Sequence, residues 1–257
     1  MSFAAARPLA ENAGLAHLGE RVARLASIPD ALAERMLRTP NRNGRPNSDV
    51  VRQVVGAEVR HRLSRHWQID FPAHMGEHEA SFYEHPYHHL QRNTRPLRDG
   101  WWINPHANVQ LRAVLSRRER FLATPLDANP PAFTWFESSL IPDDTLLVVD
   151  RDDDFTHGIL QSRAFIVWCE AVHSRRTPTL AVDSFPFPWP PSTPLHALTA
   201  AQEEHRHAIA RAARGTDPDQ LNAAVLAAYG LPVDLEPAAL LAKLTDLNRE
   251  RASRAKP

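Results

Sequence analysis

Glycine and cysteine are scarce in this chain of 257 residues, which holds nine glycines and one cysteine. The glycines do not cluster, so the Gly-x-Gly fingerprint of a nucleotide-binding turn and the Walker phosphate loop are both absent. The single cysteine, Cys169, has no second cysteine to form a disulfide with in the chain. It lies in an apolar run, where we expect a buried, unreactive thiol in a reducing, cytoplasmic setting.

The chain also lacks net charge and long apolar runs. Thirty basic residues balance 30 acidic ones, so nucleic-acid binding would have to come from a local patch. No stretch approaches the ~20 apolar residues that span a membrane. Residues 1–7 are too short and too broken by polar residues for a signal peptide, so we expect no membrane association.

Lysine is nearly absent. The chain has two lysines, Lys243 and Lys256, and the rest of its 30 Lys and Arg residues are arginines. The planar guanidinium fork of arginine fits phosphates and base edges, which favours a nucleic-acid ligand. A GC-rich genome, which the high alanine and proline content also indicates, explains the same preference. Both explanations remain open at the level of composition.

An apolar segment, residues 157–191, is the stretch around which the rest can be arranged. Apolar residues recur at helical spacing through Trp168 with little polar face left, so this helix should be buried on most sides. Asp152–Asp154 precede it and can cap its free amide groups. The Phe-Pro-Phe-Pro-Trp-Pro-Pro stretch within Ser184–Pro191 can neither continue a helix nor pair as a central strand, which predicts an extended aromatic strap.

Short strands and helices alternate irregularly before this segment, and helices follow it. We expect strands at 66–71, 100–104, 121–125, 132–136 and 145–150, and helices at 76–94 (broken by Pro86), 108–116, 197–214, 218–229 and 236–252. This pattern predicts an α+β fold: a mixed or antiparallel sheet layer packed around a central buried helix, followed by a C-terminal helical subdomain. The expected divisions are a helical lead-in at 1–40, an α+β domain at 41–191 and the helical subdomain at 192–257. The last should pack back on the first layer or on a partner, because its own core is small.

Residues 39–49 form a loop by every turn criterion. The loop carries Arg42, Asn43, Arg45 and Asn47, whose side chains suit phosphate contacts and bidentate base contacts. A solvated turn that ends in an Asn or Ser helix cap accounts for the same composition. The residues alone do not choose between the two interpretations.

The histidine-rich stretch around His74 and His78 could hold a metal, because two histidines four apart are typical of helical zinc ligands. The His-Glu-x-x-His order of zinc hydrolases is absent, however, and solvated helix faces account for the histidines. The carboxylates at Asp150 and Asp152–Asp154 could hold magnesium, but capping of the following helix explains them more simply. We therefore expect no metal site in this chain.

Asn129-Pro130-Pro131 invites comparison with amino-methylating enzymes, whose Asn-Pro-Pro motif is followed by an aromatic residue that stacks on the flipped base. Here Ala132 follows and cannot stack, and the glycine-rich turn that holds S-adenosylmethionine is missing. No nucleophile elbow or nuclease-like carboxylate–lysine pattern occurs either. We expect this chain to be non-catalytic and to hold no cofactor of its own.

Several stretches share motifs with one known family. They are Asn43–Val50, Trp67–Phe71, Glu79–Ala80, Tyr83–Glu84, Pro86–Tyr87, Arg120–Pro125, Asp152–Phe155, Gly158–Arg163 with Trp168, Phe185–Pro190, Leu221–Pro232 and Leu247–Arg251. Together they resemble the C-terminal portion of fused type IIG/IIL (MmeI-like) restriction–modification DNA methyltransferases. In that family a methyltransferase core precedes a target recognition domain and a helical tail. The resemblance covers nearly the whole chain and is most specific from about residue 145 to residue 252.

The resemblance implies that residues up to about Pro191 read the DNA sequence, as the specificity subunit of a phage-defence methyltransferase system. A separate, adenine-specific methyltransferase core, acting in trans, would supply S-adenosylmethionine and the chemistry. The partners implied are double-stranded DNA and that core. The family usually has a basic residue after the turn at Thr124–Pro125, whereas this chain has Leu126–Asp127. A remnant of a split methyltransferase gene would show the same features.

The residues that we expect to contact DNA are arginines and polar loop residues. They are Arg42, Asn43, Arg45, Asn47, Arg95, Arg98, Arg117, Arg118, Arg120, Thr124, Arg175 and Arg176. Arg163 lies in the apolar helix, where a buried structural role is expected. An alternative function is a non-catalytic protein-interaction or scaffold subunit, with the aromatic strap and the helical tail as its contact surfaces. A third hypothesis is a metal-dependent hydrolase that uses the histidine-rich helix.

Overall fold

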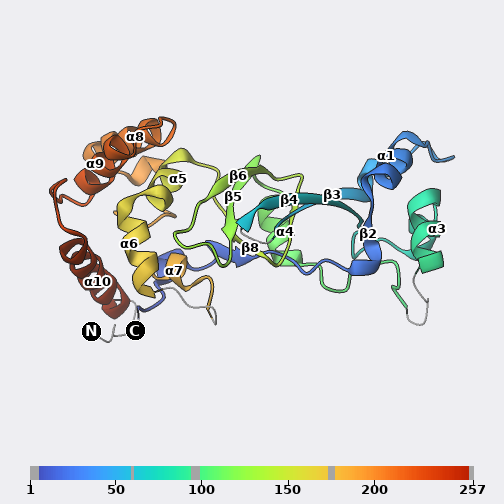
Figure 1. Ribbon diagram of the computed structural model, residues 1–257, viewed down its shortest axis with the longest axis horizontal. Coiled ribbons are helices and arrows are strands. Elements are labelled where there is room, and N and C mark those ends of the chain that lie inside the picture. The colour runs from blue at the N-terminus through green and yellow to red at the C-terminus, as the bar shows by residue number, and fades with distance from the viewer. Residues whose placement is uncertain (1–5, 59–60, 94–98, 173–176, 255–257) are drawn as a thin grey trace. The chain divides into compact units, whose positions relative to one another are not determined.

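The computed structural model describes residues 6–58, 61–93, 99–172 and 177–254 (Figure 1). The chain forms two compact units. Unit 1 comprises residues 1–17, 118–136 and 147–257, and unit 2 comprises residues 18–117 and 137–146. The predicted divisions at 40/41 and 191/192 fall inside unit 2 and unit 1, respectively, so they do not coincide with the boundaries of the compact units. The three-part division stays a prediction about which segments carry which function.

Unit 2 is built on a four-stranded mixed sheet. In the order of the sheet, the strands are β2 (Ser27–Ile28), β4 (Leu63–Ile69), β3 (Val51–Ala57) and β7 (Ile141–Pro142). β4 runs antiparallel to both β2 and β3, whereas β7 pairs with β3 in parallel. β4 confirms the strand predicted at 66–71. β3 has no counterpart among the predicted strands, although Val51 and Val54 on it are buried in the core.

Helices and aromatic loop residues cover this sheet. The helical segments are η2 (Arg24–Ala26), α1 (Asp30–Arg38), η3 (Asn47–Asp49), α2 (Glu77–Ala80), α3 (Glu84–Asn93) and α4 (Val109–Leu115). The helical stretch predicted at 76–94 is confirmed as α2 and α3. Its break lies before Pro86, which occupies the first turn of α3, where a missing N–H costs no helical hydrogen bond. α4 confirms the helix predicted at 108–116, and Asn108 caps it.

The strand predicted at 100–104 is wrong. These residues form turns, and Ile103 makes only an isolated bridge to Phe71. Trp101 and Trp102 pack against the core of unit 2 from this loop, and the Trp102 indole donates to the Met75 carbonyl at 3.0 Å. The aromatic run that indicated a strand therefore reflects burial against the core rather than pairing in a sheet.

Unit 1 joins a second sheet to most of the helices. Its strands, in sheet order, are β1 (Ala16–Leu18), β8 (Leu146–Val149), β5 (Arg120–Pro125) and β6 (Thr134–Glu137). Its helices are η1 (Ala10–Asn12), α5 (Asp154–Gln161), α6 (Arg163–Val172), α7 (Leu180–Asp183), η5 (Leu195–Ala197), α8 (Ala200–Ala213), α9 (Pro218–Ala228) and α10 (Pro237–Arg254). β5, β6 and β8 confirm the last three predicted strands.

The predicted central helix is buried, but it is two helices. Ser162, between α5 and α6, has an extended backbone, and its hydroxyl donates to the Ile159 carbonyl at 2.7 Å. Asp153 caps α5 by accepting the Thr156 amide at 2.8 Å, which confirms the predicted role of the preceding carboxylates. Cys169 is buried in α6, where desolvation raises the pKa of its thiol, as expected for an unreactive side chain.

The aromatic strap is extended, as predicted, and lies within the core. Phe185 and Phe187 are fully buried, and Trp189 stacks on Phe155 with ring centroids 4.9 Å apart. Asn248 of α10 donates to the Ser184 carbonyl at 2.7 Å. The strap is therefore an internal element, and its proposed role as an exposed contact surface in the scaffold hypothesis is wrong.

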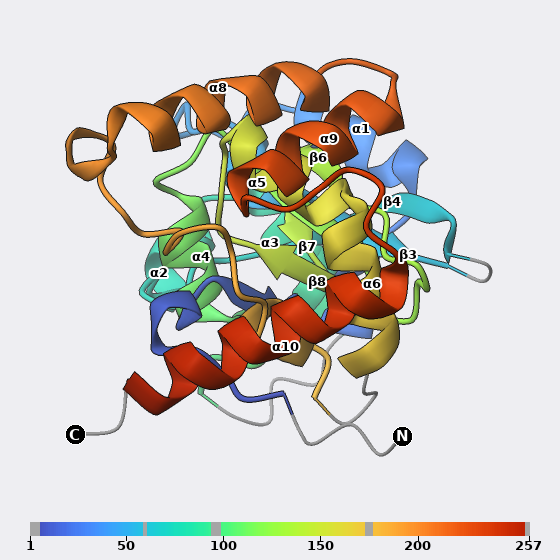
Figure 2. The same cartoon turned by 90° about the vertical axis from the view of Figure 1, so that its left-hand side faces the viewer.

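The helical tail packs on the same core as α5 and α6 (Figure 2). Its buried apolar side chains come from all three helices: Ile209 of α8, Leu221 and Val225 of α9, and Leu240 and Leu244 of α10. This confirms the predicted helices and the expectation that the tail packs back on the first layer. The chain thus has an α+β fold with a C-terminal helical region. In the described part of the chain, no helix combines the length and the apolar character needed to cross a membrane.

Candidate nucleic-acid interface

The side-chain amides of two buried residues, Asn41 and Asn47, stabilise the loop at residues 39–49. Asn41 donates to the Asn47 side-chain oxygen at 2.8 Å. Asn47, which is 1% exposed, donates in turn to the carbonyls of Met36 and Thr39 at 2.8 and 3.0 Å. All these partners lie inside the protein, so we leave Asn47 out of the DNA contacts that we propose below and assign it to loop positioning.

The outer side of the loop carries the other three predicted contact residues. The Arg42 side chain is 93% exposed, with its Nε 3.4 Å from a carboxylate oxygen of Glu84. Asn43 is exposed, and its side-chain oxygen accepts the backbone amide of Arg45 at 3.1 Å. The Arg45 guanidinium pairs with Glu79, and this hydrogen bond raises the pKa of Arg45. The loop thus displays Arg42 and Asn43, while Arg45 is partly engaged by a carboxylate.

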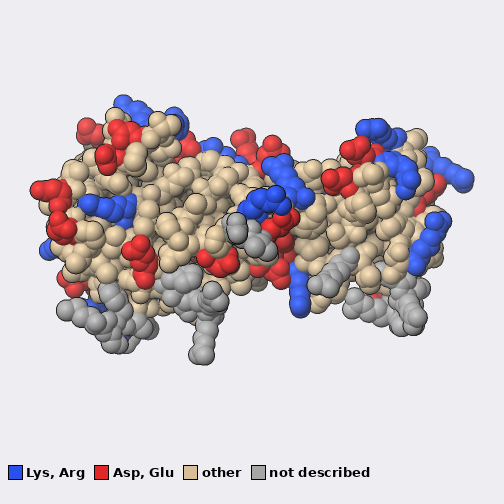
Figure 3. All heavy atoms as spheres, viewed as in Figure 1, with Lys and Arg blue, Asp and Glu red and all other residues tan. Residues whose placement is uncertain are grey.

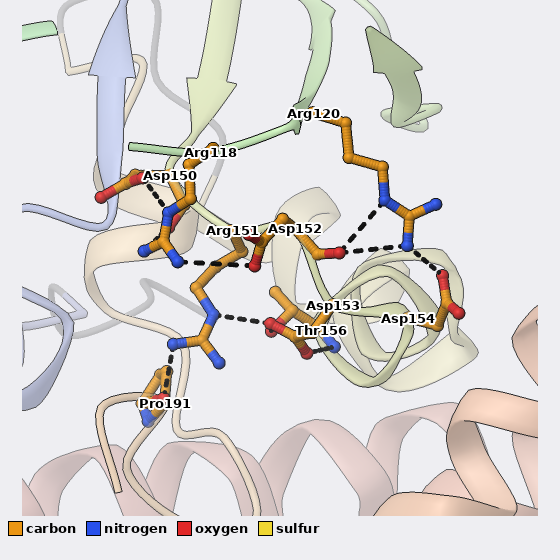
Figure 4. Close-up of polar contacts among 9 residues, drawn as sticks. All are labelled: Arg118, Arg120, Asp150, Arg151, Asp152, Asp153, Asp154, Thr156 and Pro191. Carbon is orange, nitrogen blue, oxygen red and sulfur yellow. Dashed lines mark hydrogen bonds and ion pairs between the residues drawn. The ribbon is translucent and has the colours of Figure 1, made fainter. Parts of the chain in front are cut away.

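Arg118 and Arg120 lie in a network of ion pairs at the start of α5 (Figure 4). Arg118 donates to Asp150 at 2.9 Å and to Asp152 at 3.4 Å. Arg120 donates to the Asp152 carbonyl at 3.0 Å and to the Asp154 carboxylate at 2.8 Å. Both predicted contact residues are therefore already bound to acidic residues of their own unit.

The neighbouring residues extend this network. Arg151 donates to Asp153 at 2.7 Å and to the Pro191 carbonyl at 2.8 Å, which joins the cap of α5 to the end of the strap (Figure 4). Desolvation opposes ionisation of Asp154, but hydrogen bonds from Arg214 and Arg120 outweigh it and lower the pKa of the carboxyl group. The network pairs four arginines with four aspartates and links β5, the end of the strap and α5.

The remaining predicted residues fall into three groups. The Arg117 side chain is exposed and has no ion pair or hydrogen bond to any described residue. Thr124 is 1% exposed, and its hydroxyl accepts the Ala132 amide at 3.2 Å, so we leave it out of the proposed contacts as well. The others lie outside the described residues: Arg95, Arg98, Arg175 and Arg176.

Arg163 has the structural role that was expected. Its guanidinium donates to the carbonyls of Val233 and Leu235 at 3.1 and 2.9 Å, and these interactions join α6 to the α9–α10 connection. His74 and His78 belong to no group of three or more metal-ligating side chains among the residues that the structure describes.

Two clusters in unit 2 were missed by reasoning from the sequence. Arg112 of α4 binds Glu20 and Asp70, and a pocket of about 200 Å³ opens beside these three residues. Arg35 of α1 and Arg92 of α3 line a second pocket, with three histidines. The first cluster has no local motif, because its members come from segments far apart in the sequence. The histidines of the second cluster belong to the histidine-rich stretch noted in the sequence, but their meeting with Arg35 of α1 depends on the tertiary structure.

Comparisons with known proteins find one relevant likeness. No protein-family model matches the chain, and no curated protein matches its sequence. A solved structure of the type IIL restriction–modification enzyme MmeI in complex with DNA superposes with a TM-score of 0.57 at 15% sequence identity. The match covers 93% of this chain and 35% of that enzyme chain. The chain therefore has the fold of about a third of that restriction–modification enzyme.

Proposed function

We propose that this chain is a sequence-specific DNA target recognition module of a restriction–modification system, of the kind that protects against phage. In this proposal it is non-catalytic, and a methyltransferase core acting in trans binds S-adenosylmethionine and modifies the base. The observation that carries the proposal is the shared fold, which extends over 93% of the chain and was found in an enzyme solved with DNA.

The 39–49 loop supports the proposal chemically. A module that reads DNA needs polar side chains held in fixed positions, since phosphate contacts set the register and base-edge contacts give the specificity. The buried amides of Asn41 and Asn47 hold this loop, and Arg42 and Asn43 are exposed on it. Arginine pairs with guanine and asparagine with adenine in the major groove, so these two residues are our candidates for base contacts. Arg117 is a candidate for a phosphate contact.

The test is a binding measurement with the full chain, alone and with the separate methyltransferase core that the proposal requires. Selection from a random duplex library, followed by titration at several salt concentrations, measures both the preferred sequence and the dependence on salt. We expect one enriched sequence and an affinity that falls as salt rises, because bound phosphates release counterions. Failure to bind duplex DNA under both conditions would refute the proposal.

Arg42→Gln/Asn43→Ala tests the loop directly. Loss of each bidentate base contact costs about 1–3 kcal/mol, so the loss of one alone weakens specific binding about 5- to 150-fold. The double variant should lose at least that much, while binding to random DNA changes less. Arg249→Gln is the matched control, because Arg249 is also exposed and also lies 3.4 Å from a carboxylate, that of Asp246. Equal effects of the two variants would exclude a specific role for the loop.

A non-catalytic scaffold subunit, or a remnant of a split gene that keeps only docking surfaces, is the second candidate. The observation that favours it is the pairing of Arg45, Arg118 and Arg120 with carboxylates, which reduces the cationic surface. It predicts a stable complex with the methyltransferase core that shows no sequence preference on DNA. Deletion of residues 192–257 cannot test it, since α8, α9 and α10 complete the core of unit 1.

A further inference from the structure

A cleft in unit 2 is lined by residues of α1 and α3. This α1–α3 cleft has a volume of about 360 Å³. The residues that line it are Leu32, Arg35 and Met36 of α1 and Glu84, His85, His88, His89 and Arg92 of α3. On the face shown in Figure 3, Lys and Arg side chains gather over these two helices with acidic side chains between them.

The charge of the cleft is positive. Arg35 and Arg92 are exposed, and neither side chain has an ion pair or hydrogen bond to any residue in the described part of the chain. Glu84 is the only acidic residue of the lining, and Arg42 lies 3.4 Å from it and offsets its charge. Arg35 and Arg92 differ in this respect from Arg45 and Arg112 of the same unit, which pair with Glu79 and Glu20.

The histidines place ring nitrogens beside these charges, although the His88 Nδ1 already lies 3.3 Å from the side-chain oxygen of Gln91, to which it donates. His85 and His88 are exposed, and His89 is half-buried. Desolvation and the charge of Arg92 lower the pKa of His89, so that its ring is neutral at neutral pH and still carries one N–H group. Guanidinium groups flanked by imidazole N–H donors form a set of ligands suited to an oxyanion.

The apolar part of the cleft favours an anion that also carries apolar groups. Leu32 is half-buried, and it and Met36 give the cleft an apolar side on α1. A phosphodiester carries a negative charge between two sugars, and it therefore presents both an anion and apolar CH groups. Both kinds of surface have a counterpart in the cleft.

We propose that the α1–α3 cleft binds a backbone phosphate of duplex DNA, with Arg35 and Arg92 as its cationic ligands and His85 and His89 as hydrogen-bond donors. This inference rests on the proposed function and adds a positioning contact to it. The cleft and the 39–49 loop meet at the Arg42–Glu84 ion pair. A phosphate held in the cleft would set the register in which Arg42 and Asn43 approach the bases.

The experiment compares the wild-type chain with Arg35→Gln/Arg92→Gln. Both are measured in whichever form of the wild type binds DNA, the chain alone or the chain with the methyltransferase core. Arg211→Gln/Arg249→Gln, on α8 and α10, is the control that removes the same charge elsewhere. Affinity for duplex DNA is measured between about 50 and 200 mM salt. Log K falls with log salt, and loss of one phosphate contact makes this negative slope shallower by about 0.9. Compared with the wild type, this corresponds to about eightfold weaker binding at 0.1 M salt.

The expected result is this loss of slope in the cleft variant alone, equal for specific and random duplexes, with histidine ring signals that shift in the wild type when DNA is added. An unchanged slope in the cleft variant, with wild-type binding intact, would overturn the cleft inference and leave the proposed function standing. Wild-type protein that binds no duplex DNA would overturn both. Since Arg35 and Arg92 are exposed, circular dichroism should show both variants folded like the wild type.

Discussion

Substitution of Arg112 by methionine should destabilise unit 2 more than any surface change. The Arg112 guanidinium makes two hydrogen bonds to Glu20 and two to Asp70. The side chains of Glu20 and Asp70 are only 1% and 3% exposed, whereas that of Arg112 is 30% exposed. Desolvation would lower the pKa of Arg112, but the hydrogen bonds to Glu20 and Asp70 raise it overall. Both carboxylates are therefore buried, and the Arg112 guanidinium pairs with each of them.

The expected cost follows from that burial. Removing one member of a buried ion pair costs about 3–5 kcal/mol, because an uncompensated charge stays behind. Here two carboxylates would stay behind, so Arg112→Met should reach the upper part of this range. Arg112→Met/Glu20→Gln/Asp70→Asn removes all three charges and leaves side chains of similar size. We expect the triple variant to recover most of the lost stability, since no buried ion remains.

Hydrogen–deuterium exchange with peptide resolution is the suitable assay, because global unfolding of a chain with two units need not be two-state. Peptides from β3 and β4 report on unit 2, and peptides from α9 and α10 serve as an internal control in unit 1. If exchange of the β3 and β4 amides in Arg112→Met stayed within about 0.5 kcal/mol of the wild type, the assumption that this ion cluster stabilises the unit would be wrong. A triple variant less stable than Arg112→Met would refute it equally.

Two further predictions concern α5. Gly158→Ala should destabilise unit 1 by about 1–2 kcal/mol, measured by hydrogen exchange in peptides from α5 and α8. The new Cβ would lie 2.8 Å from Ile209 Cγ2, and this overpacking exceeds the ~1 kcal/mol gain in helix propensity. Gly76→Ala, whose new Cβ would have no atom within 4 Å, is the control. Burial lowers the pKa of His157 below 6.5, so the unfolded chain binds the proton more readily and stability should fall as pH decreases from about 6.5. His157→Gln should flatten this part of the pH profile, and an unaltered profile would exclude the role of His157.

The elements that the sequence predicts well are those with local causes. Asp153 caps α5 and the prolines of the strap exclude regular pairing, and each effect acts within a few residues. The sequence predicts a helix break at Pro86, but Pro86 lies in the first turn of α3, where proline is tolerated. The strand predicted at 100–104 is wrong because Trp101 and Trp102 pack on the core of unit 2 from a loop, and this packing depends on the tertiary structure. The missed strand β3 mixes polar and apolar residues without clear alternation, so no period-two pattern marks it in the sequence. Its strand conformation is seen from its backbone pairing with β4 and β7.

The candidate site shows the same division. Composition and turn chemistry alone place exposed polar residues on the 39–49 loop, and Arg42 and Asn43 lie there as expected. Which other arginines are free to meet a ligand depends on carboxylates elsewhere in the chain. Arg118 meets Asp150 and Arg112 meets Glu20, 32 and 92 residues away. Arg35 lines a cleft and has no ion pair with any carboxylate of the described residues. Helix caps and turns depend on neighbours in the chain, whereas charges interact through space, so only the tertiary structure decides which arginines are neutralised and which remain available.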